Sequence, residues 1–249
     1  MDSFDELKAY LPDVEVIATD VDDTLTIGGL LTSDVVRGIE YINGIGKRVI
    51  LVTGRSGGAC TTLSQYLPVE AVIAENGGVV IRDHDIAPVR LPGDHTSRLE
   101  RCFQEIVGEF PGMRQAQDNP FRLTDRSIDN LSIPGYAYEE IRRIAHSYGL
   151  TITVSSVQTH ILSPECSKAA ALGAVVGGRS TITIGDSAND ESMFDREFFP
   201  LSVGVANVRN YLDTMEHRPR WIMSKEQGHG FIEFVEILRS AVRARADRP

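Results

Sequence analysis

The chain has 249 residues, of which 42% are hydrophobic and 24% are charged, and its formal net charge is −10. This length and composition are typical of a globular protein with one large domain or with a domain that carries an insertion. The acidic balance argues against nucleic acid or an anionic membrane as a partner, because both require a basic surface.

No apolar run approaches the length of about 18 residues that a membrane span requires. The first residues are acidic and lack the features of a signal peptide. Cys60, Cys102 and Cys166 are odd in number and widely spaced, so they suggest neither a disulfide framework nor a CxxC site. We therefore expect a reduced, cytoplasmic protein.

Short apolar runs rich in β-branched residues alternate with helical patterns in the first and last thirds of the chain. Buried strands are expected at 14–19, 48–53, 71–74, 181–185, 201–205 and, more weakly, 221–223. Helical spacing follows Thr32 and Ser33, extends from about Ser167 to Val176, and returns near the C-terminus. This alternation predicts an α/β fold with a Rossmann-like parallel-sheet core.

The segment 82–162 has a different character, because it is polar and interrupted by prolines. It contains two helical patterns, at 99–106 and 141–148, and short strand candidates at 130–133, 150–154 and 159–162. We interpret it as an inserted α+β domain between two halves of the core, 1–81 and 163–249. The alternative is that this segment continues a single sheet.

Three carboxylates follow the first strand within four residues: Asp20, Asp22 and Asp23. Burial of a carboxylate is unfavourable unless a cation or several hydrogen-bond donors meet it. A divalent metal together with a phosphorylated ligand explains such a cluster better than structural needs alone.

Three further segments extend this pattern in a fixed order. Thr53-Gly54-Arg55 ends the second strand, Lys168 opens a helix after the insertion, and Gly185-Asp186-Ser187-Ala188-Asn189-Asp190 follows a later strand. Ligands of open parallel sheets bind at the carboxyl ends of strands. Lys168 also opposes the helix dipole, and a local rule broken in this way indicates a functional site.

With these four motifs in this order, the chain resembles the haloacid dehalogenase superfamily of aspartate-nucleophile phosphotransferases. It is most similar to the branch with an α/β cap between the second and third motifs, which includes Cof-type sugar phosphatases, sucrose-phosphate phosphatase and archaeal phosphoglycolate phosphatase. Glu75-Asn76-Gly77-Gly78 also resembles this branch. Asp23, and Ala169 after Lys168, stand where many members have Gly.

The resemblance implies that Asp20 attacks phosphorus to form an aspartyl-phosphate and that Asp22 serves as general acid and base. It also implies a Mg²⁺ ion held by Asp20, the backbone carbonyl of Asp22 and Asp186, with Asp190 holding a metal-bound water. Taken singly, several of these residues would equally suit a helix cap.

The same resemblance places the phosphate on Thr53, Gly54 and Arg55, with Lys168 supplying the compensating charge. Asn189 would orient Lys168 or the phosphate. Thr53 and Asn189 could instead be helix caps.

Substrate choice should depend on the cap, where the polar side chains of 121–127 and 155–160 are the first candidates for contact with the leaving group. Arg122 or Arg126 could bind a substrate carboxylate or a sugar hydroxyl, although solvated surface arginines are the alternative. His160, near the junction with the core, is expected to be structural.

The expected function is that of a Mg²⁺-dependent phosphomonoesterase acting on a small phosphorylated metabolite. A sugar phosphate is favoured and phosphoglycolate is second. A phosphomannomutase-like phosphomutase and a non-catalytic binding protein are the alternatives. We expect no nucleic-acid or membrane partner, and a monomer or small homo-oligomer.

Overall fold

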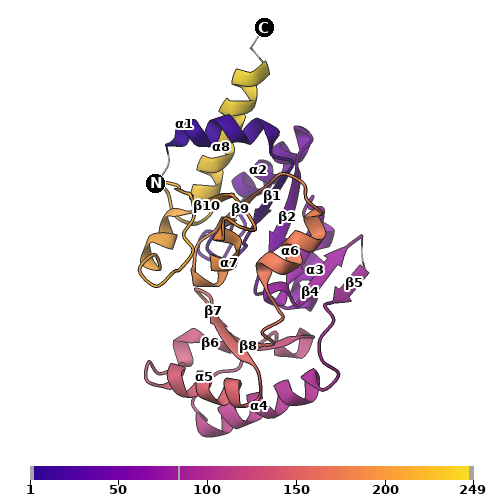
Figure 1. Cartoon of the computed structure of the whole chain (residues 1–249), viewed down its shortest axis with the longest axis vertical. Helices are drawn as coiled ribbons and strands as arrows, with labels where there is room; N and C mark the ends of the chain where they lie inside the picture. Colours follow the sequence, from indigo (N-terminus) through magenta and orange to yellow (C-terminus); the bar gives the residue numbers. More distant parts are fainter. Residues whose placement is uncertain (1–2, 84, 247–249) are drawn as a thin grey trace.

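The computed structural model describes residues 3–83 and 85–246 and has two lobes (Figure 1). The core lobe is built on an eight-stranded sheet with the order β11-β10-β9-β1-β2-β3-β4-β5. The cap lobe, residues 95–162, contains a three-stranded sheet with the order β6-β8-β7. Within the described ranges, no helix is long and apolar enough to cross a membrane.

Six strands of the core sheet run parallel to one another, and β1 lies between β2 and β9. Each forms where an apolar, β-branched run was predicted: β1 (Val16–Thr19), β2 (Arg48–Val52), β3 (Ala71–Ala74), β9 (Thr181–Gly185), β10 (Leu201–Gly204) and β11 (Trp221–Ile222). Thr19 is in register with Leu51 and with Ile184, so the carboxyl ends of the three central strands lie side by side. The predicted α/β class with a Rossmann-like core is confirmed.

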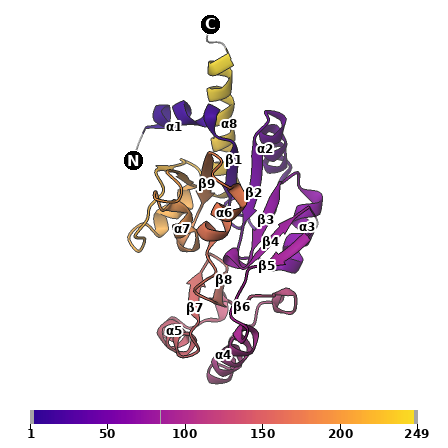
Figure 2. The same ribbon diagram turned by 45° about the vertical axis from the view of Figure 1, so that its right-hand side comes forward.

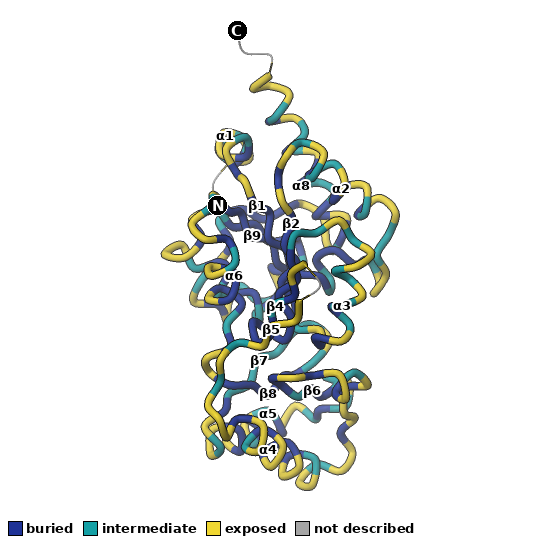
Figure 3. Tube along the Cα trace, turned by 90° about the vertical axis from the view of Figure 1, so that its right-hand side faces the viewer, coloured by how far each residue is buried: buried dark blue, intermediate teal, exposed yellow. Residues whose placement is uncertain are grey.

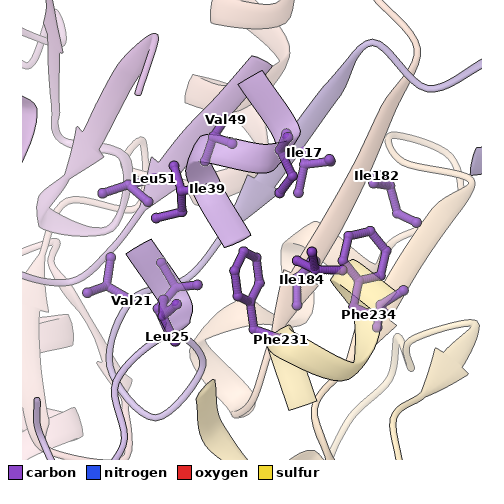
Figure 4. Packing of buried hydrophobic residues seen from close by; sticks show 14 of the residues in the cluster. Ile17, Val21, Leu25, Ile39, Val49, Leu51, Ile182, Ile184, Phe231 and Phe234 are labelled. Atoms are coloured by element: carbon purple, nitrogen blue, oxygen red, sulfur yellow. The ribbon is translucent and has the colours of Figure 1, made fainter. Parts of the chain in front are cut away.

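Helices cover both faces of the core sheet because successive residues of a strand point to opposite sides. One face packs against α1 (Phe4–Tyr10), α2 (Ser33–Gly44), α3 (Gly57–Tyr66) and α8 (Gln227–Ala246), and the other against α6 (Lys168–Val176) and α7 (Glu191–Phe194). Figure 4 shows Phe231 and Phe234 of α8 between α2 and the sheet. The buried strands lie at the centre of this lobe (Figure 3).

The edge of the core sheet contains a hairpin that the sequence analysis did not predict. β4 (Val79–Arg82) and β5 (Asp85–Pro88) are antiparallel and extend the sheet beyond β3. All four residues of β5 are exposed, so the strand lacks an apolar pattern. Because a boundary at residue 82 would assign β5 to the insertion, we propose that the inserted unit begins after Pro88.

The cap lobe has its own small core. Its antiparallel strands are β6 (Asp125–Asp129), β7 (Thr151–Val154) and β8 (Gln158–Leu162), and its helices are α4 (His95–Glu109) and α5 (Ala137–Ser147). The helices pack on the sheet through an apolar cluster that includes Leu99, Phe103, Ile141 and Ile161. In Figures 1 and 2, β7 and β8 lie between these helices and the core lobe.

One predicted cap strand is wrong. Residues 130–133 were expected to form a strand, but Asn130–Ser132 is a short 3-10 helix and the strand precedes it. The buried side chains of β6 include Asp125 and Ser127, so this strand shows no apolar alternation. The other short 3-10 helices are η1 (Leu11–Asp13), η2 (Glu75–Gly77), η3 (Asn119–Phe121), η5 (Ala188–Asp190) and η6 (Ala206–Asn210).

Glu70, the residue before β3, forms ion pairs with two arginines. Its carboxylate accepts bonds of 2.8 and 2.7 Å from Arg179 and one of 2.8 Å from Arg82. The bonds from Arg179 hold the pKa of Glu70 below its ordinary value. We expect Glu70→Gln to lower the free energy of unfolding by about 1 kcal/mol at neutral pH, because a charge-assisted pair is lost.

The free energy of unfolding that is lost in Glu70→Gln should depend on pH. Since the folded-state pKa of Glu70 is depressed, its contribution is complete above the unfolded-state value of about 4.3 and disappears as the pH falls through the folded-state value. Urea unfolding between about pH 7 and pH 3 would measure it, with the exposed Glu40→Gln as control. A difference that stays constant over this range would contradict the prediction.

Candidate active site

The loops that follow β1, β2 and β9 meet at the carboxyl ends of these strands and face the cap lobe. A cavity there is lined from the core by Asp20, Asp22, Gly54, Arg55 and Asn189, and from the cap by Ser155, Ser156, Val157, Gln158 and His160. The structure thus brings together residues from three of the predicted motifs. A neighbouring cavity adds the fourth, because Lys168 and Asn189 both line it.

Lys168 is the central cation of the site. It is 2% exposed, and its ammonium group donates bonds of 2.7 Å to Oδ1 of Asp20 and 2.7 Å to Oδ1 of Asp190. Burial alone would lower the pKa of Lys168, but the two carboxylates raise it above its ordinary value. As the first residue of α6, Lys168 is placed by the Ser167 cap, whose side chain accepts a bond from the Ala170 backbone.

Asp186 is a second buried acid in the same cluster. Its Oδ1 accepts a bond of 3.1 Å from the Thr24 hydroxyl, and its Oδ2 accepts one of 3.0 Å from Nδ2 of Asn207. Burial, followed by the charges of Asp190 and Asp20, raises the pKa of Asp186 well above its ordinary value. Burial likewise raises the pKa of Asp20, although Lys168 opposes the shift. Three carboxylates around one ammonium leave the cluster with excess negative charge.

This cluster fits a divalent cation. Carboxylate oxygens of Asp20, Asp186 and Asp190 lie within 4.8 Å of one another, and Mg²⁺ prefers oxygen ligands. Asp190, however, already uses Oδ1 for Lys168 and Oδ2 for the backbone N–H groups of Asp186 and Ser187. Asp186 accepts two bonds and Asp20 accepts one, so these two acids have more lone pairs left for a metal than Asp190, which accepts three and positions Lys168.

Asp22 is held by a two-pronged ion pair. Nε of Arg55 donates a bond of 2.8 Å to Oδ2 of Asp22, and Nη2 donates one of 2.6 Å to Oδ1. The pair raises the pKa of Arg55 above its ordinary value. Arg55 therefore lies in the cavity as the partner of Asp22 and not as a free cation.

The turn after β2, residues 53–55, is closely packed against its neighbours. Thr53 is fully buried, and its Oγ1 accepts a bond of 3.1 Å from the Arg55 backbone. A Cβ at Gly54 would lie 2.9 Å from Nε2 of His160 and 3.1 Å from Oδ1 of Asn76. Only glycine fits there without displacing a neighbour, and its backbone remains open to the cavity.

Arg122 lies beside this site but not among the residues that line the cavity. Its fully buried guanidinium donates to Asp118, Asp125, Gln158 and the backbone oxygen of Gly54. With every nitrogen occupied, the side chain fastens the cap to the Gly54 turn. Arg126 bonds to the backbone oxygens of Arg122 and Asp125 and is likewise engaged by the protein.

Glu75 forms the second attachment between the lobes. Its buried carboxylate accepts hydrogen bonds from the backbone of Gly57 in the core and from the backbones of Leu123 and Thr124 in the cap. The Thr124 hydroxyl adds a fourth donor at 2.7 Å. Burial raises the pKa of Glu75, and these bonds partly offset that shift.

His160 was expected to be structural, yet its ring lines the cavity. Nδ1 lies 3.0 Å from Oδ2 of Asp125 and 2.8 Å from Oγ of Ser127. Although burial alone would raise the pKa of Asp125, Arg122 and His160 lower it, so this carboxylate is ionised and requires a proton on Nδ1. Burial lowers the pKa of His160, although the bond to Asp125 and its charge oppose the shift.

Several residues at the site were not predicted as functional. Asn76 and Asn207 carry no motif of their own, whereas the cap segment 155–160 was among the predicted substrate-facing segments and contributes 155–158 and His160 to the cavity. The only available signal for Asn76 was its place in Glu75-Asn76-Gly77-Gly78.

Comparisons with known proteins agree with this geometry. A family model described as haloacid dehalogenase-like hydrolase matches residues 17–106. A phosphoglycolate phosphatase of Methanothrix thermoacetophila is 26% identical over 235 residues, which cover 92% of this chain and 98% of the relative.

Two crystal structures share the fold. Thermoplasma acidophilum 0175 superposes with a TM-score of 0.76 at 22% identity, covering 91% of this chain and 98% of the other. The sucrose-phosphatase of Synechocystis sp. PCC6803, solved with sucrose and phosphate, gives a TM-score of 0.69 at 13% identity, with coverage of 91% and 98%. The chain is thus similar to the haloacid dehalogenase-like hydrolases over residues 17–106, is similar over most of its length to a relative named phosphoglycolate phosphatase, and shares the fold of these two structures.

Proposed function

We propose that the protein hydrolyses a small phosphomonoester, with Asp20 as the nucleophile and Asp22 as the general acid and base. The observation that carries this proposal is that both carboxyl groups line one cavity while Lys168 is bonded to Asp20. A carboxylate fixed beside a cation and a second acid two residues away form the pair that two successive displacements at phosphorus require.

In the first displacement, a carboxylate oxygen of Asp20 attacks phosphorus and the ester P–O bond breaks. The departing oxygen takes a proton from the carboxyl group of Asp22, which leaves an aspartyl-phosphate at Asp20. Water then attacks this phosphorus and gives a proton to Asp22, so that inorganic phosphate and the Asp20 carboxylate are released. Arg55 would orient Asp22 through one of its two bonds, and the other bond would open so that the protonated oxygen of Asp22 can reach the leaving group.

The phosphoryl group would be bound by the Thr53 hydroxyl, the Gly54 backbone, Lys168 and Asn189. Asp20, Asp186 and the backbone carbonyl of Asp22 would hold Mg²⁺, which when bound offsets the repulsion between a dianionic phosphate and a carboxylate. Asp190 would act indirectly, by keeping Lys168 in place.

A sugar phosphate, or another ester with hydroxyl groups on its leaving group, is the substrate class that we propose. Among the described residues that line the cavity between Asp22 and the cap, the only cation is Arg55. The guanidinium of Arg55 is already paired with the carboxylate of Asp22. The cap contributes the polar side chains of Ser155, Ser156, Gln158 and His160. Hydroxyls and neutral acceptors of this kind suit a polyol better than a carboxylate.

Phosphoglycolate is the second candidate because the Methanothrix thermoacetophila relative bears the name phosphoglycolate phosphatase. Binding of its carboxylate would require a cation that this cavity does not leave free among the described residues. The three cysteines are free and buried, which supports a reducing compartment such as the cytoplasm.

Asp20→Asn should abolish phosphate release while the protein stays folded. The amide cannot attack phosphorus, but it can still accept a bond from Lys168, and one negative charge leaves a crowded cluster. Phosphate release and thermal unfolding would be measured together. Asp23→Asn, the same change in the same turn, is the control and should stay active, because Asp23 bonds to Gln227 and lies outside the acid cluster. Turnover by Asp20→Asn at the normal rate would refute the nucleophile.

Chelation by EDTA should eliminate activity, and added Mg²⁺ should restore it. The buried acids carry excess negative charge that only a bound cation can balance when a phosphate dianion enters. Phosphate release before and after metal return is the measurement. Full activity after exhaustive chelation would rule out the metal requirement.

A panel of phosphate esters should separate the two substrate classes. We expect kcat/KM for hexose or polyol phosphates to exceed that for phosphoglycolate about tenfold or more, because a buried site without a free cation discriminates against a carboxylate. A preference for phosphoglycolate would reverse the substrate assignment. Isomerised sugar phosphate without free phosphate would instead indicate a phosphomutase.

A further inference from the structure

Asn76 has a buried carboxamide without a hydrogen-bond partner. Its side chain is 3% exposed, and neither Oδ1 nor Nδ2 bonds to any of the described residues. Buried polar side chains almost always have a partner, and an exception requires an explanation. A ligand that enters from outside would provide one.

The carboxamide lies between the two groups that we propose to bind phosphate. On one side, the backbone N–H of Asn76 donates a bond of 3.1 Å to the backbone oxygen of Thr53. The side-chain Oδ1 of Asn76 lies 3.1 Å from the position that a Cβ at Gly54 would take. On the other side, Asn76 lines a cavity together with Lys168 and Asn189. Asn76 therefore contacts the Gly54 turn through Oδ1 and borders the same cavity as Lys168.

The backbone around Asn76 is in the left-handed region, which residues other than glycine rarely adopt. Glu75, Asn76 and Gly77 have consecutive φ angles of 51°, 54° and 100°. The four bonds to the Glu75 carboxylate hold the turn on one side. On the other side, a Cβ at Gly77 would lie 2.2 Å from the backbone oxygen of Ser167. Conformations of this kind persist where surrounding contacts impose them, and they are concentrated at functional sites.

We propose that Asn76 is a substrate-binding residue whose Nδ2 donates a hydrogen bond to the phosphoryl group held between Gly54 and Lys168. This inference rests on the proposed phosphatase function and adds a neutral donor to it. A neutral donor stabilises the dianion without competing with Lys168 for the carboxylates of Asp20 and Asp190. Because the turn is already fixed by Glu75, the amide is in place before the ligand arrives.

Asn76→Gly is the direct test. Glycine adopts a φ of 54° without strain, and no hydrogen bond of the side chain is lost, so the melting temperature should stay close to that of the unchanged protein. The dissociation constant of inorganic phosphate, measured by calorimetry with Mg²⁺ present, should rise about ten- to a hundredfold, as expected for the loss of a hydrogen bond to a charged group.

Two variants complete this test. Asn76→Asp retains the size of the side chain and tolerates a positive φ, but its charge repels the dianion, so it should weaken phosphate binding at least as much. Asp83→Gly makes the same kind of backbone change at φ 50° on an exposed residue of the core-sheet edge, and it should leave phosphate affinity unchanged. Unaltered phosphate affinity in both Asn76 variants would overturn the proposal.

Kinetics separate the phosphoryl group from the leaving group. A contact with the phosphoryl group lowers kcat/KM by the same factor for p-nitrophenyl phosphate and for a sugar phosphate. A loss confined to one of the two esters would place Asn76 against the leaving group and contradict the inference. If the unchanged protein bound phosphate but hydrolysed no ester, the proposed function would fail, whereas the phosphate measurement on Asn76→Gly would still decide this inference.

Discussion

The ammonium group of Lys168, shared between Asp20 and Asp190, is the interaction on which this site depends. It joins the end of β1 to the turn after β9 through a helix that follows the inserted cap. Buried carboxylates repel one another, and without a cation between them they would take up protons or separate. The single lysine fixes two of the three acids, and Asp20 and Asp186 would hold the metal. The unfavourable place of a lysine at a helix start is thus compensated by two ion pairs.

Charge also determines how the cap is joined to the core. Arg122 and Glu75 are both buried, and each has its bonds divided between the two lobes. A buried charge tolerates little displacement, because every lost bond leaves an unpaired polar group. The cap residues that line the cavity are therefore positioned by the same type of interaction that positions the acids.

The sequence predicted the α/β class and the six parallel strands because each strand is a continuous apolar run. It also predicted that the residues after those runs would converge, and the structure brings Asp20, Asp186 and Lys168 together. The strand β6 and the hairpin at the sheet edge were missed, since Asp125 and Ser127 face inward and β5 is exposed throughout. We predicted a ligand contact for Arg122 because nothing in the polar segment around it indicates that the side chain is buried and paired with Asp125. The orientation of His160 depends on Asp125, which is 35 residues away, so its place beside the cavity could not be inferred from the sequence alone.

The four hydrogen bonds received by Glu75 have a mechanical consequence. Leu123 and Thr124 cannot leave the core without exposing four donors and a buried carboxylate at the same moment. The bond from Arg122 to the backbone oxygen of Gly54 is a second buried attachment of this kind, so any separation of the lobes would have to break buried bonds at two places beside the cavity.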